Sequence, residues 1–155
     1  MNRIDIKLVA SDDYRLLSLI AAWYQAEWGI PVTDTVNNLR AVTADSYQFQ
    51  MVLSVNGKAV ATGGIYNHVS LLNHKPDLNV YKKWLAQVYT LPGERGRGYG
   101  ILLCKQIQDH CSALAFEKIY LFTHTAGPMY EKLGWSTIQR LAIGNRNIAV
   151  MEKAL

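Results

Sequence analysis

The chain has 155 residues, half of them apolar, which suits one packed domain over residues 1–155 and argues against intrinsic disorder. Its net charge of +4 favours an anionic ligand, but no basic stripe interleaved with aromatic residues is present, so no nucleic-acid partner is expected. No apolar run approaches the roughly 18 residues of a membrane helix. The first ten residues carry Arg3, Asp5 and Lys7 and lack the apolar core of a signal peptide. We therefore expect a cytoplasmic protein with no membrane partner.

Hydrophobic periodicity and turn signals predict the order β-α-α-β-β-β-α-β-α-β-β. In chain order these elements are a strand at 3–9, helices at 11–27 and 34–42, strands at 47–55, 58–66 and 84–91, a helix at 99–114, a strand at 118–123, a short helix at 128–134, and strands at 136–143 and 147–152. This order defines an α/β or α+β chain with a mixed sheet.

Particular residues mark the ends of these elements. Ser11 is the predicted N-cap of the first helix, and Gly29 ends that helix. Asn56-Gly57 is a strong hairpin signal between two strands. Gly63-Gly64 either weakens the following strand or marks a bulge. Residues 68–83 are predicted to form a polar connection.

Cysteine and histidine spacings predict neither a disulfide framework nor a metal site. Cys104 and Cys111 are two helical turns apart and form no Cys-x-x-Cys motif, so we expect reduced packing residues. The four histidines lack a ligand spacing such as His-x-x-x-His, so no metal ligand is predicted.

The most informative segment is residues 91–100, Leu-Pro-Gly-Glu-Arg-Gly-Arg-Gly-Tyr-Gly. A predicted strand runs into a glycine-rich turn that opens a helix, and the first N–H groups of a helix have no internal partner. Together with the helix dipole they favour an anion, and Arg95 and Arg97 add positive charge. The alternative is a tight turn with solvated arginines.

Two common phosphate-binding motifs do not match this segment. A Walker loop ends in Gly-Lys-Ser/Thr, whereas Gly100 precedes Ile101 here. A dinucleotide fingerprint needs Gly-x-Gly-x-x-Gly, and the glycines here are evenly spaced, two apart. The loop therefore needs a different family to explain it.

Three motifs in register resemble the GCN5-related N-acetyltransferase (GNAT) superfamily. Arg95-Gly-Arg-Gly98-Tyr-Gly100 is similar to its pyrophosphate loop, Arg/Gln-x-x-Gly-x-Gly/Ala. Upstream, Pro76-Asp-Leu and Trp84-Leu-Ala-Gln-Val-Tyr-Thr-Leu-Pro92 resemble the stretch that leads into this loop. Downstream, Tyr130-Glu-Lys-Leu-Gly-Trp135 is similar to a signature of the family. The order of elements matches over essentially the whole chain.

The resemblance implies a mixed, mostly antiparallel sheet with splayed central strands, flanking helices, and acetyl-coenzyme A as cofactor. Backbone groups near Val88 and Thr90 would hold the pantetheine arm, and the loop amides would hold the pyrophosphate. Many members have an asparagine where this chain has Thr123, which leaves that pantetheine contact open. The implied cofactor-binding residues are Val88, Tyr89, Thr90, Arg95, Gly96, Arg97, Gly98, Tyr99, Gly100 and Thr123.

Two residues are candidates for proton transfer. The resemblance places Tyr130 near the cofactor sulfur, and a tyrosine, with a reference pKa of about 10, suits a proton donor at neutral pH. The strand at 84–91 contains no acid, so the glutamate base that some relatives place there is missing. His68 and His124 are the possible bases, and His124 is the better one because it adjoins the cleft that the resemblance implies. Packing remains the alternative for Tyr130, and a surface or packing role for His124.

The acceptor side is less specified by the sequence. Glu27, Trp28 and Asp34 flank the break between the first two helices, where relatives bind acceptors, and the acids suit a cationic amine. Solvated helix-end acids are the alternative for Glu27 and Asp34. Residues 68–83 carry no motif that identifies an acceptor.

The sequence therefore predicts an N-acetyltransferase that moves acetyl from acetyl-CoA to a primary amine, on a small molecule or a peptide, by direct attack in a ternary complex. A non-catalytic acyl-CoA-binding or regulatory domain on the same fold is one alternative. Another phosphate or nucleotide binder that shares only the turn is a second. The protein is expected to be a monomer or a homodimer.

Overall fold

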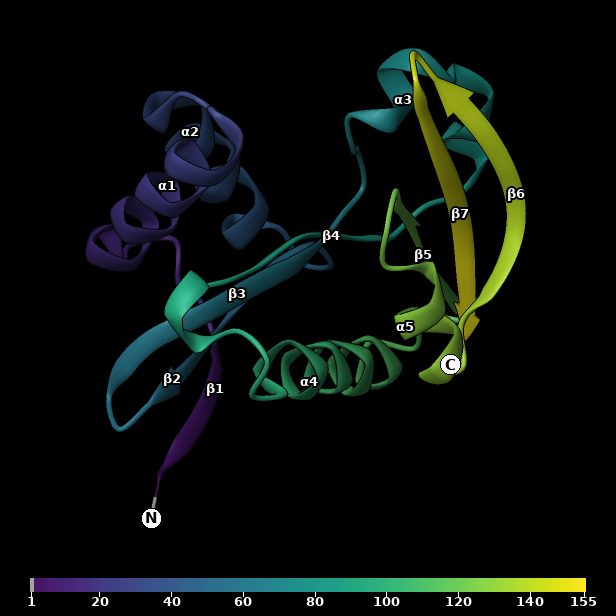
Figure 1. Ribbon diagram of the computed structural model, residues 1–155. Helices are drawn as coiled ribbons and strands as arrows, with labels where there is room; N and C mark the ends of the chain where they lie inside the picture. The colour runs from purple at the N-terminus through teal and green to yellow at the C-terminus, as the bar shows by residue number, and fades with distance from the viewer. Residues whose placement is uncertain (1) are drawn as a thin grey trace. The chain divides into compact units, whose positions relative to one another are not determined.

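The computed structural model describes residues 2–155, which divide into two compact units (Figure 1). The first unit contains the chain up to Ile65 together with Gln87–Ile107, and the second contains Tyr66–Ala86 and Gln108–Leu155. Seven strands hydrogen-bond in the order β1-β2-β3-β4-β5-β7-β6, and β4 (Trp84–Thr90) contributes residues to both units. All strand pairs with a known direction are antiparallel except β4 and β5, so the predicted mixed, mostly antiparallel sheet is confirmed.

The first unit begins with an antiparallel meander. Its strands are β1 (Ile4–Leu8), β2 (Phe49–Val55) and β3 (Lys58–Tyr66). Asn56 and Gly57 turn β2 into β3 with φ of 51° and 83°, as the hairpin signal predicts. The helices of this unit are α1 (Tyr14–Trp28), α2 (Val32–Ala44), η2 (Pro92–Glu94) and the start of α4 (Tyr99–Ala113).

Helix α1 is held at both ends. The Asp13 carboxylate accepts a hydrogen bond from Leu16 N, so Asp13 is the N-cap, and the predicted cap at Ser11 is wrong. A cap side chain bonds an amide two or three residues ahead of it, and the bonded amide here is that of Leu16, three residues after Asp13. Gly29 ends the helix in the left-handed conformation, with φ of 70°.

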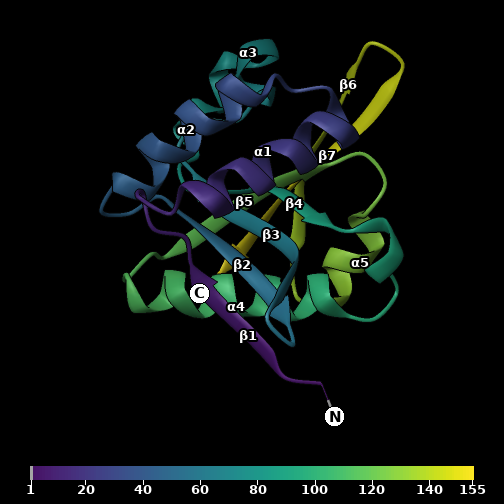
Figure 2. The same ribbon diagram turned by 90° about the vertical axis from the view of Figure 1, so that its left-hand side faces the viewer.

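Both faces of the first sheet are covered (Figures 1 and 2). Helices α1 and α2 pack on one face through a buried cluster made of Val9, Leu17, Ile20, Trp23, Tyr24, Leu39, Val52 and Tyr89. On the other face, Gly63 lies close to Val88 and to Ile107 of α4. A Cβ atom at Gly63 would come within 3.1 Å of Val88 Cγ2 and 3.5 Å of Ile107 Cδ1. Val88 and Tyr89 are neighbours in β4 and therefore serve opposite faces.

The Gly63-Gly64 pair lies inside an unbroken stretch of β3. Its register with β2 is continuous there, with Gly63 opposite Met51 and Gly64 opposite Gln50, and the irregularity lies between Leu53 and Ser54. A Cβ atom at Gly64 would overlap Gln50 Oε1, so the two glycines make room for side chains.

The second unit is a smaller sheet with short helices. Its elements are α3 (Leu71–His74), η1 (Pro76–Val80), β5 (Lys118–Thr123), α5 (Gly127–Lys132), β6 (Ser136–Ile143) and β7 (Arg146–Ala154). Strand β7 lies between β5 and β6 and is antiparallel to both. The predicted polar connection at 68–83 is wrong in part, because Leu71, Leu72 and Leu78 are buried and hold two short helices.

In the part of the chain that the structure describes, β4 and β5 share one pair of partners, Trp84 and Tyr120. Cys104 and Cys111 are both free and buried on α4, and burial raises the pKa of each thiol to about 12. Both cysteines are therefore packing residues, as predicted. Over residues 2–155, no helix has the length and apolar character needed to cross a membrane.

Candidate cofactor-binding site

Strand β4 has an irregular backbone conformation at Gln87, called the bulge below, and a side chain of α1 bonds to it. Gln87 has φ of 55°, which non-glycine residues rarely adopt. The Tyr24 hydroxyl, fully buried, donates a hydrogen bond of 2.6 Å to the Gln87 carbonyl. The helix therefore holds this carbonyl, and with it the course of the strand just before Val88.

A buried polar network supports the Tyr24 hydroxyl. Gln50 Nε2 donates to Tyr24 Oη at 3.1 Å and to Thr62 Oγ1 at 2.8 Å, and Thr62 Oγ1 donates to Met51 O at 2.7 Å. Gln50 and Thr62 are fully buried. Neither residue was predicted from the sequence, although a Gln and a Thr inside apolar strands are the signal that would have identified them.

Beyond the bulge, the backbone of β4 has one edge directed away from β3. Leu91 N donates to Val60 O at 2.9 Å, so Leu91 faces β3. Because successive residues of a strand direct their N–H and C=O groups to opposite sides, Tyr89 also faces β3, while Val88 and Thr90 face away. These are the two residues for which the sequence predicts pantetheine contacts, and this geometry supports that prediction.

The loop after β4 matches the chemistry of a pyrophosphate. Gly96 and Gly98 have φ of 81° and 84°, and a Cβ atom at either would meet no heavy atom within 4 Å. The first helical hydrogen bond of α4 runs from Leu102 N to Gly98 O, so the amides of Tyr99 and Gly100 lie ahead of it at the open end of the helix. Open amides at a helix N-terminus are suited to an anion.

The two loop arginines are both in ion pairs. Arg97 Nε lies 3.7 Å from Glu94 Oε2, and its side chain is mostly exposed. Arg95 makes three contacts within the first unit: Nε donates to Thr90 O at 2.7 Å, a terminal nitrogen lies 3.1 Å from Glu27 Oε1, and the guanidinium lies 5.5 Å from the centre of the Tyr89 ring.

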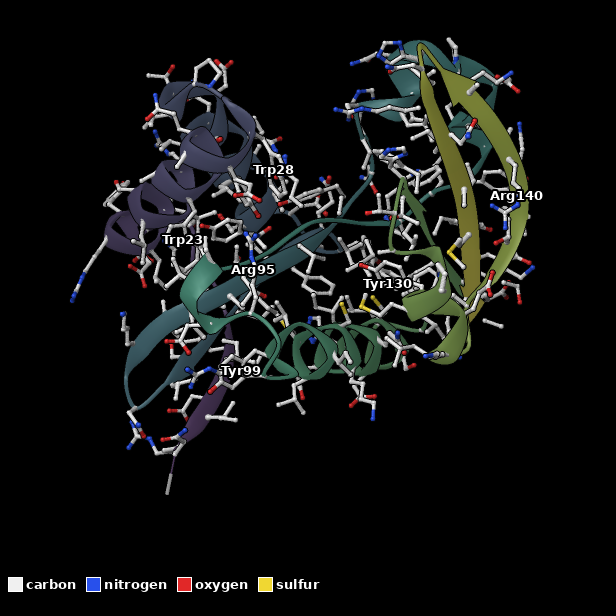
Figure 3. The ribbon with its side chains drawn as sticks, viewed as in Figure 1. Trp23, Trp28, Arg95, Tyr99, Tyr130 and Arg140 are labelled. Atoms are coloured by element: carbon white, nitrogen blue, oxygen red, sulfur yellow. The ribbon has the colours of Figure 1, made fainter. Side chains whose placement is uncertain are left out.

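Arg95 borders a group of aromatic side chains through its contact with the Tyr89 ring; Trp23, Trp28 and Arg95 are labelled in Figure 3. Trp28 is 46% exposed, and its ring centre lies 5.0 Å from that of Tyr24 and 6.2 Å from that of Tyr89. Trp23 is buried against Tyr89, with ring centres 5.4 Å apart, and is a core residue. The structure thus brings Glu27 to Arg95 of the glycine loop and Trp28 to Tyr89 of β4, links that the sequence did not predict.

Asp34, the remaining acceptor candidate, lies elsewhere in the same unit. It is exposed in the first turn of α2, where the helix dipole favours a carboxylate. The contacts described above for Glu27 and Arg95 do not include Asp34. Its role therefore stays a prediction.

The proton-transfer candidates and Thr123 lie in the second unit. Tyr130 is buried in α5, with its ring edge-on to Trp135 at 5.9 Å. Thr123 Oγ1 accepts a hydrogen bond of 3.0 Å from Ala126 N, which shapes the turn into α5. His124 Nδ1 lies 3.0 Å from Asn147 O. A carbonyl can only accept, so Nδ1 carries the proton and the neutral ring keeps its lone pair on the exposed Nε2.

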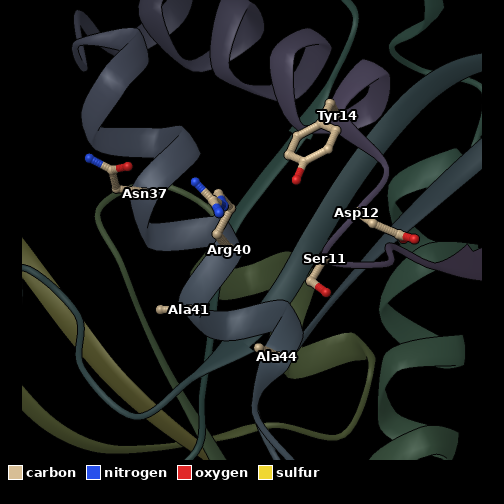
Figure 4. Close-up of a pocket in the computed structure, with 7 residues that line it drawn as sticks. All are labelled: Ser11, Asp12, Tyr14, Asn37, Arg40, Ala41 and Ala44. Carbon is tan, nitrogen blue, oxygen red and sulfur yellow. The ribbon is translucent and has the colours of Figure 1, made fainter.

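A cavity of about 460 Å³ lies at the other end of α1 (Figure 4). Arg40 is 6.0 Å from the Tyr14 ring centre at this cavity. Its lining residues are Ser11, Asp12, Tyr14, Asn37, Arg40, Ala41 and Ala44. None of the predicted site residues lines it.

The sequence of residues 14–135 matches the Acetyltransferase (GNAT) family, well over half of the chain. The protein therefore belongs to the GNAT acetyltransferase family, as its motifs predict. Comparison with the curated proteins finds no match for the sequence.

Solved structures of acetyltransferases share the fold at low sequence identity. An aminoglycoside 6'-N-acetyltransferase complexed with coenzyme A superposes with a TM-score of 0.76 at 13% identity, covering 97% of this chain and 96% of that one. A putative acetyltransferase from Salmonella typhimurium with its cofactor acetyl-CoA gives 0.72 at 13%, covering 97% and 93%. A spermidine N-acetyltransferase chimera built in part from the Vibrio cholerae enzyme gives 0.69 at 14%, covering 97% and 95%.

Proposed function

We propose that the protein is a cytoplasmic, acetyl-CoA-dependent N-acetyltransferase that acts on a primary amine. The observation that carries this proposal is that two groups suited to the cofactor, a strand edge and a set of open amides, follow each other along the chain in the first unit. The edge of β4 that faces away from β3 leads directly into the open amides of the glycine loop. Family membership and neighbours named for coenzyme A and acetyl-CoA add support.

The chain's own residues supply two kinds of contact to such a cofactor. The backbone groups of Val88 and the N–H of Thr90 bond the pantetheine arm as an added strand would, with Tyr89 fixing the strand between them, while the Thr90 carbonyl holds Arg95. The amides and positive charge of the loop bind the pyrophosphate, through Arg95, Gly96, Arg97, Gly98, Tyr99 and Gly100. Thr123 retains its hydroxyl hydrogen, which is suited to a pantetheine carbonyl.

Bound acetyl-CoA supplies a thioester whose acyl carbon accepts the amine nitrogen. The new C–N bond forms as the C–S bond breaks, so the nitrogen loses a proton and the departing thiolate gains one. Tyr130 donates the proton to the sulfur, and His124 accepts the proton from the amine through Nε2. The hydrogen bond from His124 Nδ1 to Asn147 O supports this tautomer.

The acceptor site is formed by Glu27, Trp28 and Asp34. The Glu27 carboxylate suits a cationic amine through its charge, and the half-exposed Trp28 indole suits it through the face of the ring. Structural neighbours are named for aminoglycosides and for spermidine, both amines, and small-molecule or peptide amines fit the same chemistry. The protein acts as a monomer or a homodimer, as one domain over residues 1–155.

Thermal denaturation with separate additions of acetyl-CoA, coenzyme A and ATP tests the cofactor. A ligand that binds only the folded state raises the melting temperature as its concentration rises. We expect acetyl-CoA and coenzyme A to raise it and ATP to leave it nearly unchanged. Equal stabilisation by ATP would favour a general nucleotide binder and contradict the proposal.

A further inference from the structure

The carboxylate of Glu27 lies at an electrostatically unfavourable position on its own helix. Glu27 lies in the last turn of α1, at the negative end of the helix dipole, and α1 has no basic residue in that turn. The compensating charge comes from Arg95, which follows β4 and lies far along the chain. This pairing therefore joins the end of α1 to the glycine loop.

Arg95 is held by three groups at once, and a guanidinium is the side chain that can satisfy all of them. Its Nε donates to Thr90 O, a terminal nitrogen pairs with Glu27, and its flat face covers the Tyr89 ring. A lysine has the charge but a single ammonium nitrogen on a flexible stem, so it cannot make these contacts together. The start of the loop is therefore fixed relative to the last residues of β4.

We infer that Glu27 is a positioning residue for the cofactor loop, acting through Arg95, in addition to its acceptor role. Oε1 of Glu27 orients the guanidinium, and the guanidinium fixes the loop whose amides bind the pyrophosphate. The Glu27 side chain is 34% exposed, and Oε2 of the same carboxylate accepts from a cationic amine. This inference rests on the proposed function.

A positioning role for Glu27 predicts the opposite change in coenzyme A affinity from the one that long-range charge alone predicts. Coenzyme A is an anion, so removing a nearby carboxylate should tighten its binding if long-range charge alone matters. If Glu27 positions the loop, its removal should instead weaken binding. Glu27 should also differ from Asp34, which makes no such contact with the loop in the described residues.

Isothermal titration with coenzyme A tests this on the full chain. Glu27→Gln should weaken binding about two- to fivefold, the range of a partly exposed ion pair. Arg95→Lys, which keeps the charge, should weaken it about tenfold or more, because a hydrogen bond and a ring contact are lost as well. The double variant should bind about as Arg95→Lys does, because the two residues act as one unit. Asp34→Asn is the matched control and should bind as the wild type does.

Kinetics supply the readout that a purely structural role would not move. Glu27→Gln should raise the KM for both acetyl-CoA and the amine, whereas Asp34→Asn should raise only the amine KM. Unchanged or tighter coenzyme A binding by Glu27→Gln would overturn the inference, as would wild-type binding by Arg95→Lys. Failure of the wild type to bind coenzyme A would instead contradict the proposed function.

Discussion

The hydroxyl group of Tyr24 supports the part of β4 that we assign to the cofactor. Tyr24→Phe removes one oxygen atom and keeps the ring, which packs against Trp28 and Tyr89. The variant loses the 2.6 Å bond to the Gln87 carbonyl and the 3.1 Å bond from Gln50. The bulge at Gln87, with its unfavourable φ of 55°, is then held by fewer contacts.

The expected loss of unfolding free energy follows from these two hydrogen bonds. Each buried hydrogen bond contributes roughly 0.5–1.5 kcal/mol net, so the variant should lose about 1–3 kcal/mol of unfolding free energy. Gln50 Nε2 keeps its partner Thr62, which places the expected value below the upper limit. Because the bulge sets the direction of Val88 and Thr90, coenzyme A should also bind more weakly.

Urea unfolding followed by circular dichroism measures the stability, and calorimetry measures coenzyme A binding. Tyr14→Phe is the matched control, since Tyr14 lies on the same helix and is 60% exposed. It should unfold within about 0.5 kcal/mol of the wild type. If Tyr24→Phe also does so, and binds coenzyme A normally, then Tyr24 does not hold the bulge.

Three further variants and treatments have definite expected outcomes. Gly98→Ala should lose about 1–2 kcal/mol of unfolding free energy and bind coenzyme A more weakly, because φ is 84° there. Gly93→Ala, at a position without positive φ, should do neither. Equal shifts of the urea midpoint in the two variants would refute the reasoning. Tyr130→Phe should keep coenzyme A binding and slow the single-turnover rate by roughly 10²–10⁴-fold, and a near wild-type rate would remove Tyr130 as proton donor. Because burial raises the pKa of Cys104 and Cys111 to about 12, iodoacetamide at pH 8 should leave both thiols unmodified in the native protein and alkylate both in urea, as mass spectrometry can determine.

Local patterns in the sequence predicted most of the fold. The strands at 58–66, 118–123 and 136–143 have the predicted bounds. Turn residues limit each of them, and the pattern of apolar residues can be recognised within each segment alone. The helices at 71–74 and 76–80 were missed, since segments of four or five residues are too short for a helical period. Their buried leucines become informative only in the folded unit.

The candidate site was predicted where its chemistry is local. The glycine loop is a continuous motif, and the structure gives two of its glycines, Gly96 and Gly98, a positive φ. The pairing of Arg95 with Glu27 joins residues distant in sequence, and so does the bond from Tyr24 to Gln87. Neither has a spacing that a single sequence could reveal, because both depend on how α1 packs on β4.

Acetyl transfer itself is the central claim, and amine-dependent thiol release from acetyl-CoA measures it most directly. With a panel of polyamines, aminoglycosides, amino acids and peptides, we predict that at least one amine produces free thiol and N-acetylated product in equal amounts. Gly98→Val should abolish both with the fold retained. Coenzyme A binding without thiol release for any amine would contradict the account and favour a non-catalytic acyl-CoA-binding domain.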